Sequence, residues 1–245
     1  MIPSQKTKFI SNWIKSYVDK MPTKAESLVI GISGGIDSSV SSTLSAMTGL
    51  KTIVLSMPIK QKENQHDLSL KHQEWLIKKF DNVEAHTISI DKLFVSFSTT
   101  LNKFDNEHGF ANSRARLRMT TLYQVAAANK GIVVGTGNKV EDFGVGFYTK
   151  YGDGGVDISP IADCNKSEIW ELGKELGILK EIIDAPPTDG LWDDGRTDEG
   201  QLGFKYQELE DAMKNSDSPH RQEYEKIRKQ NLHKMEPIPV CKIPS

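Results

Sequence analysis

The stretch "VIGISGGIDSSVSSTL", residues 29–44, leaves an apolar run through two adjacent glycines and then enters a segment that carries an acid and several hydroxyls. Gly34 and Gly35 allow the backbone to approach a ligand closely and to adopt positive φ at low cost. The helix that we expect at 38–48 offers unpaired N–H groups and the positive end of its dipole. Serine hydroxyls add further donors. The stretch is therefore typical of a binding site for a phosphate or a pyrophosphate.

Two common phosphate-binding patterns do not describe this stretch. The chain has no GxxxxGK[ST] sequence, and "GISGGI" lacks the last glycine of the dinucleotide pattern GxGxxG. Asp37 would lie beside the phosphates and repel them unless a cation such as magnesium lay between. The alternative is a simple glycine turn, in which Asp37 and the serines only cap the helix.

Apolar runs and helical patterns alternate along the first half of the chain. We expect strands at 28–32, 51–58, 83–90 and 131–136, and helices at 5–20, 38–48, 64–80, 91–103, 113–130, 166–178, 204–214 and 219–231. This order predicts an α/β fold, with a doubly wound, mostly parallel, Rossmann-like sheet and helices on both faces. Ligands bind such sheets at the carboxyl ends of the strands.

We expect one domain over residues 1–245. It consists of an N-terminal helix (5–20), a nucleotide-binding core (28–180) and a C-terminal lid with helices (184–245). The glycine-rich segment 143–157 and the turn-rich segment 184–200 are predicted to be loops that act as lids. The N-terminal helix is predicted to pack on the body through Phe9, Ile10, Trp13, Ile14 and Val18.

Composition excludes several classes of protein. Of the 245 residues, 37% are hydrophobic and 26% charged, as in ordinary soluble proteins, and the net charge of −2 gives no basic field for a nucleic-acid or membrane partner. Cys164 and Cys241 lie far apart and form no CxxC pair, which favours a reducing cytosol over a disulfide scaffold or zinc site. The first residues contain no run typical of a signal or membrane span. We expect a cytoplasmic protein.

Six further segments follow the glycine loop in a fixed order. They are "NSRARLRM" (112–119), "VVGTGNKVED" (133–142), "GFYTKYGDGGVDISPI" (146–161), "NKSEIWELGKELG" (165–177), "APPTDGLWDDGRTDE" (185–199) and "HK" (233–234). Together with "SGGIDSS", which resembles the pyrophosphate loop of the N-type ATP pyrophosphatases, they resemble the ammonia-dependent NAD synthetases. The resemblance covers about residues 28 to 234. It implies ATP-dependent amidation of deamido-NAD with ammonia through an acyl adenylate, giving NAD, AMP and pyrophosphate.

The resemblance also implies roles for individual residues. Asp37 and Lys166 are the implied catalytic residues, and Asp37 and Glu141 are the implied Mg²⁺ ligands. The implied ATP-binding residues are Gly31, Ser33, Gly34, Gly35, Asp37, Ser38, Ser39, Thr136, Lys166 and Thr188. The implied deamido-NAD-binding residues are Arg116, Lys150, Asp157, His233 and Lys234.

The chain departs from the family pattern in one region. It has one residue more than usual between Glu141 and "GFYTK", so Asp142 is the alternative metal ligand. The family's usual aspartate after "GT" is Gly137 here, which removes one polar contact. Phe147 and Tyr148 are candidates either for stacking on the pyridine ring or for the core.

The resemblance further implies the partners. They are ATP, deamido-NAD and ammonia, with a homodimer formed near the 113–130 helix and no glutaminase on this chain. Rival interpretations are a relative that amidates nicotinate mononucleotide, one that thiolates tRNA, and a non-catalytic nucleotide-binding module. Low net charge and the absence of paired cysteines argue against tRNA thiolation.

Overall fold

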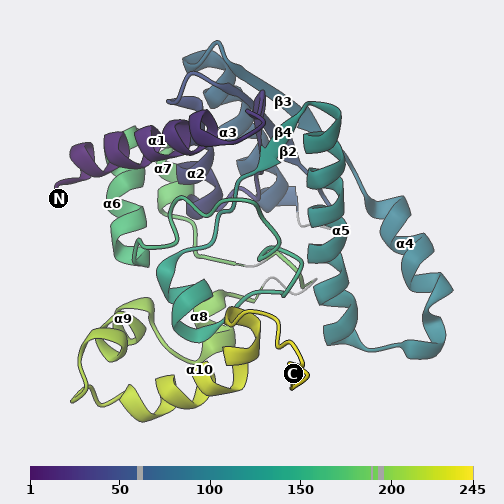
Figure 1. Ribbon diagram of the computed structural model, residues 1–245, viewed down its shortest axis with the longest axis vertical. Coiled ribbons are helices and arrows are strands. Elements are labelled where there is room, and N and C mark those ends of the chain that lie inside the picture. The colour runs from purple at the N-terminus through teal and green to yellow at the C-terminus, as the bar shows by residue number, and fades with distance from the viewer. Residues whose placement is uncertain (60–62, 189, 193–195, 245) are drawn as a thin grey trace.

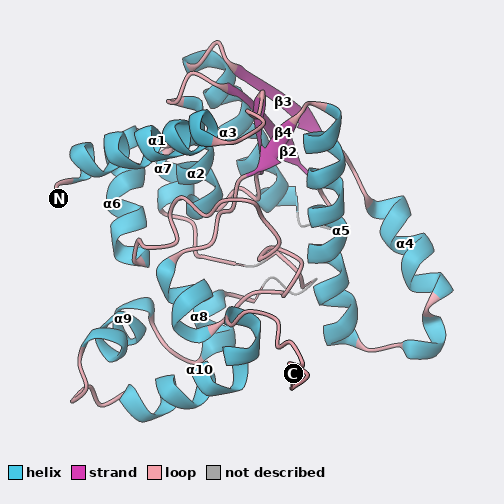
Figure 2. Ribbon diagram, in the orientation of Figure 1, coloured by secondary structure: helices cyan, strands magenta, loops and turns pink. Residues whose placement is uncertain are grey.

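The structure, a computed structural model, describes residues 1–244 except 60–62, 189 and 193–195. Its centre is a parallel sheet in the order β3-β2-β1-β4 (Figures 1 and 2). The strands are β1 (Ser27–Gly31), β2 (Lys51–Ser56), β3 (Val83–Thr87) and β4 (Gly131–Val133). The predicted α/β class and parallel sheet are confirmed.

Helices cover both faces of this sheet. They are α1 (Pro3–Lys20), α2 (Ile36–Ala46), α3 (Glu63–Lys79), α4 (Asp91–Thr100), α5 (Glu107–Ala128), α6 (Lys166–Leu176), α7 (Lys180–Ile183), α8 (Asp198–Leu202), α9 (Tyr206–Lys214) and α10 (Arg221–Met235). A 3-10 turn, η1 (Asn102–Phe104), follows α4, and a π-helix, η2 (Lys139–Val145), follows β4. Among the described residues, no helix has the length and apolar character needed to cross a membrane.

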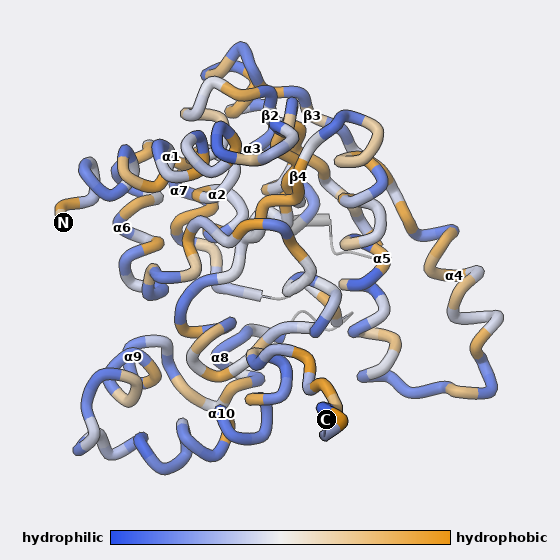
Figure 3. Tube along the Cα trace, viewed as in Figure 1, coloured by the Kyte–Doolittle hydropathy of each residue, from blue (hydrophilic) through white to orange (hydrophobic). Residues whose placement is uncertain are grey.

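The strand β1 shows how the two faces are packed. Leu28 and Ile30 lie in a buried cluster with residues of α1, α2 and α6, whereas Val29 lies in a second cluster with residues of α4 and α5. Successive side chains of a strand point to opposite faces, so a fully apolar strand needs helices on both sides. Hydrophobic colour accordingly gathers on the central strands, while α10 at the periphery is mostly hydrophilic (Figure 3).

The strand order places the candidate site. The chain runs outward from β1 to β2 and β3, and then returns to β4 on the other side of β1. The direction of winding therefore reverses between β1 and β4, and such a reversal opens a crevice at the carboxyl ends of the two strands. The glycine loop follows β1 at this point, and η2 follows β4. The α8–α10 lobe packs below them, with α9 and α10 both in contact with η2 (Figure 1).

Several element boundaries differ from the prediction. The helix predicted at 113–130 begins at Glu107, because Asn106 caps it by accepting a hydrogen bond from the Gly109 N–H at 2.7 Å. The predicted loop 143–157 is partly wrong, because η2 extends through Val145. The α10 helix continues to Met235, so His233 and Lys234 lie in its last turn and not in a tail.

The N-terminal helix is confirmed, but its predicted packing is only half right. Ile10, Ile14 and Val18 are buried, as expected. Phe9 and Trp13 are 59% and 41% exposed. They lie on the neighbouring stripe of the helix, about 100° around its axis, and the body does not cover that stripe. A predicted loop at 184–200 falls partly outside the described residues, and the described part includes the start of α8 at Asp198.

Candidate active site

The glycine loop joins β1 to α2 by a short turn that depends on Gly34. Its φ of 90° lies in the left-handed region that favours glycine. Gly35 is the N-cap of α2 with an ordinary φ of −85°, and Ser33 Oγ accepts a hydrogen bond from its N–H at 3.2 Å. Gly31 ends β1, where a Cβ atom would lie 3.3 Å from the Met57 side chain. The turn points the first N–H groups of α2 into the crevice.

The hydroxyls of the loop have partners within the loop. Ser38 Oγ donates to the Gly35 carbonyl at 3.0 Å, and Ser39 Oγ donates to the same carbonyl at 2.9 Å. Ser33 Oγ lies 3.1 Å from Ser38 Oγ and its residue is exposed. Ser38 and Ser39 are buried and fix the shape of the loop. Their contact with ATP stays a prediction.

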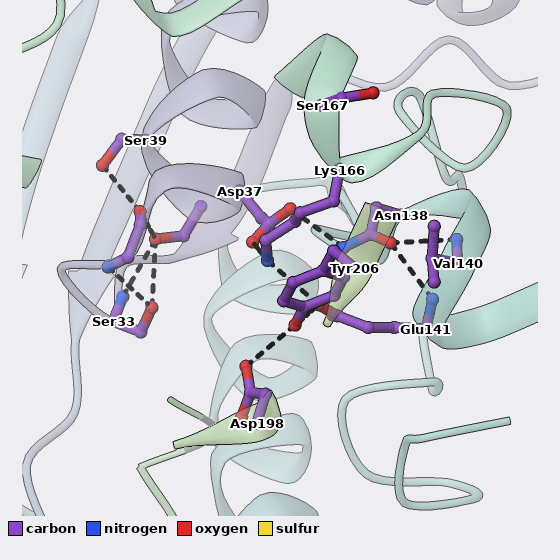
Figure 4. Close-up of polar contacts among 12 residues, drawn as sticks. Ser33, Asp37, Ser39, Asn138, Val140, Glu141, Lys166, Ser167, Asp198 and Tyr206 are labelled. Atoms are coloured by element: carbon purple, nitrogen blue, oxygen red, sulfur yellow. Dashed lines mark hydrogen bonds and ion pairs between the residues drawn. The ribbon is translucent and has the colours of Figure 1, made fainter. Parts of the chain in front are cut away.

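Asp37, Glu141 and Lys166 come together in the crevice from three different elements (Figure 4). Asp37 lies in the first turn of α2, Glu141 in η2, and Lys166 is the first residue of α6. The Lys166 ammonium donates to Asp37 Oδ2 at 2.6 Å and to Glu141 Oε1 at 2.9 Å. We call Asp37 and Glu141 the carboxylate pair. The two carboxylates proposed from sequence thus converge on one point, and Lys166 lies at that point.

Two residues that the sequence analysis did not identify hold the carboxylate pair in place. The Asn138 side chain donates to Asp37 Oδ1 at 3.1 Å and accepts from the N–H groups of Val140 and Glu141. The Tyr206 hydroxyl donates to Glu141 Oε1 at 2.5 Å, and its ring centroid lies 4.8 Å from the Lys166 ammonium. Asn138 was detectable as an N-cap before two acids. Tyr206 was not, because nothing in its local sequence distinguishes it from a core aromatic.

Burial and charge act against each other at this cluster. Burial lowers the pKa of Lys166, but the two carboxylates outweigh it and the net pKa is raised, so the ammonium stays charged. Burial raises the pKa of Asp37, and Lys166 only partly offsets this. Burial also raises the pKa of Glu141, yet Lys166 and the Tyr206 hydroxyl together bring its net pKa below the usual value. Glu141 is therefore the more firmly ionised member of the carboxylate pair.

The π-helix η2 separates the two candidate metal ligands, Glu141 and Asp142. A π-helix has a wider turn than an α-helix and accommodates an additional residue, and such turns are frequent at functional sites. Glu141 points to Lys166, whereas Asp142 lines a neighbouring cavity of about 180 Å³ together with Gly137, Tyr148 and Asp153. Burial, Asp153 and Glu141 raise the pKa of Asp142 well above its usual value. The geometry supports Glu141 as the partner of Asp37.

Gly137 and Asp142 are linked by space. A Cβ atom on residue 137 would lie 1.8 Å from Asp142 Oδ2. The Asp142 carboxylate therefore occupies the space that a side chain at position 137 would need. The two departures that the sequence shows in this region, a missing aspartate and an additional residue, therefore lie beside each other.

We expect Gly137→Asp to lower the free energy of unfolding by about 1–3 kcal/mol, because it forces a second carboxylate into filled space. The double variant Gly137→Asp/Asp142→Ala should recover most of that loss. Urea unfolding of both variants at pH 7.5 measures the two values. A single variant as stable as the parent would show that the Asp142 side chain moves aside at little cost.

The proposed substrate residues fall in two groups. Lys150, His233 and Lys234 are connected: the Lys150 ammonium donates to the His233 carbonyl at 2.9 Å, and the Lys234 ammonium donates to the Tyr148 carbonyl at 2.8 Å. These contacts join the end of α10 to the loop after η2. Burial lowers the pKa of Lys234. The pair "HK" thus has a structural role that the sequence did not reveal.

Arg116 and Asp157 lie nearby, with partners of their own. The exposed Arg116 guanidinium donates to the Lys150 carbonyl at 3.4 Å, so it borders the same loop. Asp157 accepts from the Val133 N–H at 2.7 Å and from the Tyr123 hydroxyl at 3.1 Å, which fixes the chain beside β4. Thr136 follows β4, half-buried. Thr188 is half-buried in the segment before α8, and its role as an ATP contact stays a prediction.

Phe147 and Tyr148 have different surroundings. Phe147 packs against the buried cluster of Tyr206 and Leu209, which favours the core interpretation for its ring. Tyr148 lines the cavity beside Asp142, and its hydroxyl donates to the Lys234 carbonyl at 2.5 Å. Of the two rings, Tyr148 is the one that borders open space. A larger cavity, of about 590 Å³, lies between α4, α5 and Trp192, and the carboxylate pair does not line it.

The donor set of the carboxylate pair suits magnesium. Mg²⁺ is usually held by one or two carboxylates together with phosphate oxygens and water, and rarely by a cage made only of protein. Within the described part of the chain, no group of three or more His, Cys, Asp or Glu side chains is arranged to hold a metal. Two convergent carboxylates beside the glycine loop therefore suit a metal ion that binds together with a nucleotide.

Comparisons with known proteins agree with this site. The family model described as NAD synthase matches residues 6–243. An NH3-dependent NAD+ synthetase from Carboxydothermus hydrogenoformans is 35% identical, over 84% of this chain and 83% of the relative, and one from Finegoldia magna is 35% identical, over 92% and 90%. The solved structure of NMN synthetase from Francisella tularensis is 34% identical, with a TM-score of 0.90, and the match covers 99% of this chain and 100% of that one. The chain therefore belongs to the NAD synthase family.

Proposed function

We propose that this protein is an ammonia-dependent NAD synthetase, a ligase that forms a C–N bond. It uses ATP and ammonia to convert the nicotinate carboxylate of deamido-NAD into the amide, and it releases AMP and pyrophosphate. The observation that carries the proposal is the convergence of Asp37, Glu141 and Lys166 beside the glycine loop. Family membership and the names of the two curated relatives support it.

The reaction explains why ATP is needed. A carboxylate is a poor acyl donor, because its oxygen is a poor leaving group and ammonia is protonated by the free acid. Attack of the carboxylate oxygen on the α-phosphorus of ATP forms an acyl adenylate and releases pyrophosphate. Ammonia then attacks the acyl carbon and loses a proton. The bond between the acyl carbon and the phosphate oxygen breaks, and AMP leaves with its electrons. The protein mainly positions the reactants and excludes water from the adenylate.

The residues of the site have distinct tasks in this scheme. The N–H groups at the start of α2 bind the polyphosphate, and Gly34 permits the close approach. The carboxylate pair would hold Mg²⁺, which would neutralise charge on the phosphates. Lys166 adds a positive charge beside the departing pyrophosphate. Asn138 and Tyr206 keep the carboxylates oriented.

The substrate end of the site involves the loop after η2 and the end of α10. We propose that Arg116, Lys150, Asp157, His233 and Lys234 bind deamido-NAD, and that Thr136 and Thr188 contact ATP. An arginine suits the diphosphate and the carboxylate of this substrate, because its guanidinium makes forked contacts with oxyanions. Tyr148 lines the smaller cavity, and the Lys234 ammonium donates to its carbonyl.

Lys234→Met should weaken deamido-NAD binding by about 1–3 kcal/mol, the value of one charged hydrogen bond, and should change ATP binding much less. Isothermal titration with each nucleotide separately measures both. Lys229→Met is the matched control, because Lys229 is exposed on the same helix. Equal weakening for both nucleotides would indicate a folding defect caused by loss of the contact with Tyr148, and unchanged deamido-NAD binding would remove Lys234 from the site.

Nicotinate mononucleotide is the second candidate substrate. The observation that favours it is the likeness to the Francisella tularensis NMN synthetase. Deamido-NAD is preferred because both curated relatives are named NAD+ synthetase and this chain matches most of the length of each. Incubation with ATP, Mg²⁺, ammonia and either acid, followed by identification of the amide, decides between them. Formation of neither amide would favour a non-catalytic module.

We further propose a homodimer formed near α5. The exposed apolar side chains Leu93 and Val95 of the adjacent α4, and Phe104 after it, extend the surface beside this helix. Sedimentation at micromolar protein is expected to give a dimer. An active monomer at that concentration would contradict the proposal.

The remaining partners follow from the same proposal. The chain is proposed to use free ammonia, or ammonia from a separate protein, and to bind neither nucleic acid nor a membrane. Both cysteines are free, with Cys164 buried and Cys241 exposed. Free thiols suit the proposed cytoplasmic location.

A further inference from the structure

Lys166 occupies the position where the carboxylate pair would hold a metal ion. Its side chain is 1% exposed, and its ammonium donates to one oxygen of each carboxylate. The lysine begins α6, where the helix dipole favours an anion and not a cation. The helix therefore does not account for a lysine at this position. The carboxylate pair does, because without a cation two buried carboxylates would face each other.

A divalent ion and this ammonium compete for the same oxygens. Mg²⁺ binds carboxylate oxygens at about 2.1 Å, closer than the lysine nitrogen approaches them here. Two cations bound to the same two oxygens would also repel each other strongly in a partly buried site. Metal binding through Asp37 Oδ2 and Glu141 Oε1 therefore requires the Lys166 ammonium to move.

The displaced ammonium needs a new partner. A buried charge without a partner is costly, and free Mg²⁺ brings no acceptor for it. A metal bound to a polyphosphate does, because phosphate oxygens on the glycine loop would lie at the start of α2, which packs against α6 and whose Asp37 already contacts Lys166. The cost of moving Lys166 is therefore offset only when metal and polyphosphate arrive together.

We propose that the Lys166 ammonium prevents free divalent ions from binding to the carboxylate pair. A metal–polyphosphate complex displaces the ammonium, and the phosphate oxygens then accept its hydrogen bonds. Metal and nucleotide binding are thereby coupled through one side chain. The inference rests on the proposed function only in naming a nucleoside polyphosphate as the ligand. The exchange of one cation for another follows from the contacts of Lys166.

Mn²⁺ serves as the probe, because the electron paramagnetic resonance signal of the free ion measures the unbound fraction. The protein without nucleotide should bind Mn²⁺ weakly, and Lys166→Met should bind it about 10-fold more tightly or better, since a competing charge is gone. Lys139→Met is the matched control, because the partly exposed Lys139 pairs with the exposed Asp163 outside the site. It should behave as the parent does. Equal Mn²⁺ affinity in the parent and Lys166→Met would overturn the proposal.

A second measurement covers the case in which Lys166→Met folds poorly. Removal of the lysine leaves the carboxylate pair without a cation, so the melting temperature of Lys166→Met should be lower than that of the parent. MgCl2 should raise that melting temperature while leaving the parent and Lys139→Met nearly unchanged, because only the variant has an open metal site. An equal effect of MgCl2 on all three proteins would overturn the proposal. Neither measurement uses turnover, so failure of the amidation assay would count against the proposed function alone.

Discussion

Asparagine in place of Asp37 is expected to lower the rate of pyrophosphate release at least about 100-fold, comparable to the loss of one strong electrostatic contact to a transition state. The Asp37 carboxylate lies at the start of α2, where it contacts Lys166 and follows the glycine loop. The fold should survive, because Lys166 retains Glu141 as its ionised partner. Release of pyrophosphate at limiting and at saturating Mg²⁺ measures the effect. An unchanged rate at limiting Mg²⁺ would contradict a metal role for Asp37.

The same assay separates the two acids of η2. Glu141→Gln should resemble Asp37→Asn, because it removes the other member of the carboxylate pair. Asp142→Asn should retain most of the rate, because the Asp142 carboxylate lies in the neighbouring cavity with Gly137 and Asp153. Circular dichroism of the variants excludes a general folding defect. The reverse order of effects would make Asp142 the metal ligand.

The sheet was predictable because its strands β1 and β2 are buried on both faces. Continuous apolar runs such as 28–32 need no alternation to be recognised, and the helices between them require parallel strands. The strand ends were less certain, since β4 stops at Val133 while its apolar pattern continues to 136. Beyond Val133 the chain forms an isolated bridge between Val134 and Ile158, and the Val134 N–H still donates to the Val29 carbonyl at 2.9 Å. An apolar pattern indicates that residues are buried and does not indicate where a strand ends. Residues 134–136 therefore follow β4 without extending it.

The site was predictable only where family patterns fix the order of residues. Asp37, Glu141 and Lys166 lie far apart in the chain, and their convergence depends on the sheet topology. The π-turn of η2 has no clear signature, because seven residues are too short to show a helical period. Tyr206 reaches Glu141 through packing of the α8–α10 lobe on η2, which is a tertiary contact. The contact of Lys166 with both carboxylates was equally unpredictable, since the resemblance implies only a catalytic and ATP-binding role for this lysine.

A buried histidine outside the site contributes a pH dependence to stability. His72 of α3 is fully buried and stacks on Trp75, with ring centroids 5.4 Å apart. Its Nε2 lies 3.0 Å from Ser42 Oγ, and that hydroxyl donates to the Ser39 carbonyl. Ser42 Oγ is thus left to accept from Nε2–H, which fixes the neutral tautomer. Within the described part of the chain, Nδ1 has no hydrogen-bond partner, so a proton added there would be buried without an acceptor.

The stability of the protein is expected to fall as the pH is lowered from about 6.5 towards 4, and His72 should account for about 2 kcal/mol of the loss by pH 5. Burial lowers the pKa of His72 in the folded protein to about 4 from the usual 6.5. The unfolded chain therefore binds a proton first, and each pH unit between the two values costs the folded state about 1.4 kcal/mol. Above pH 6.5 both states hold a neutral ring and the contribution vanishes.

His72→Leu, which cannot titrate, should lose about 2 kcal/mol less than the parent between pH 7.5 and pH 5, as measured by urea unfolding. Identical pH dependence in His72→Leu and the parent would show that the ring accepts its proton in the folded state without penalty.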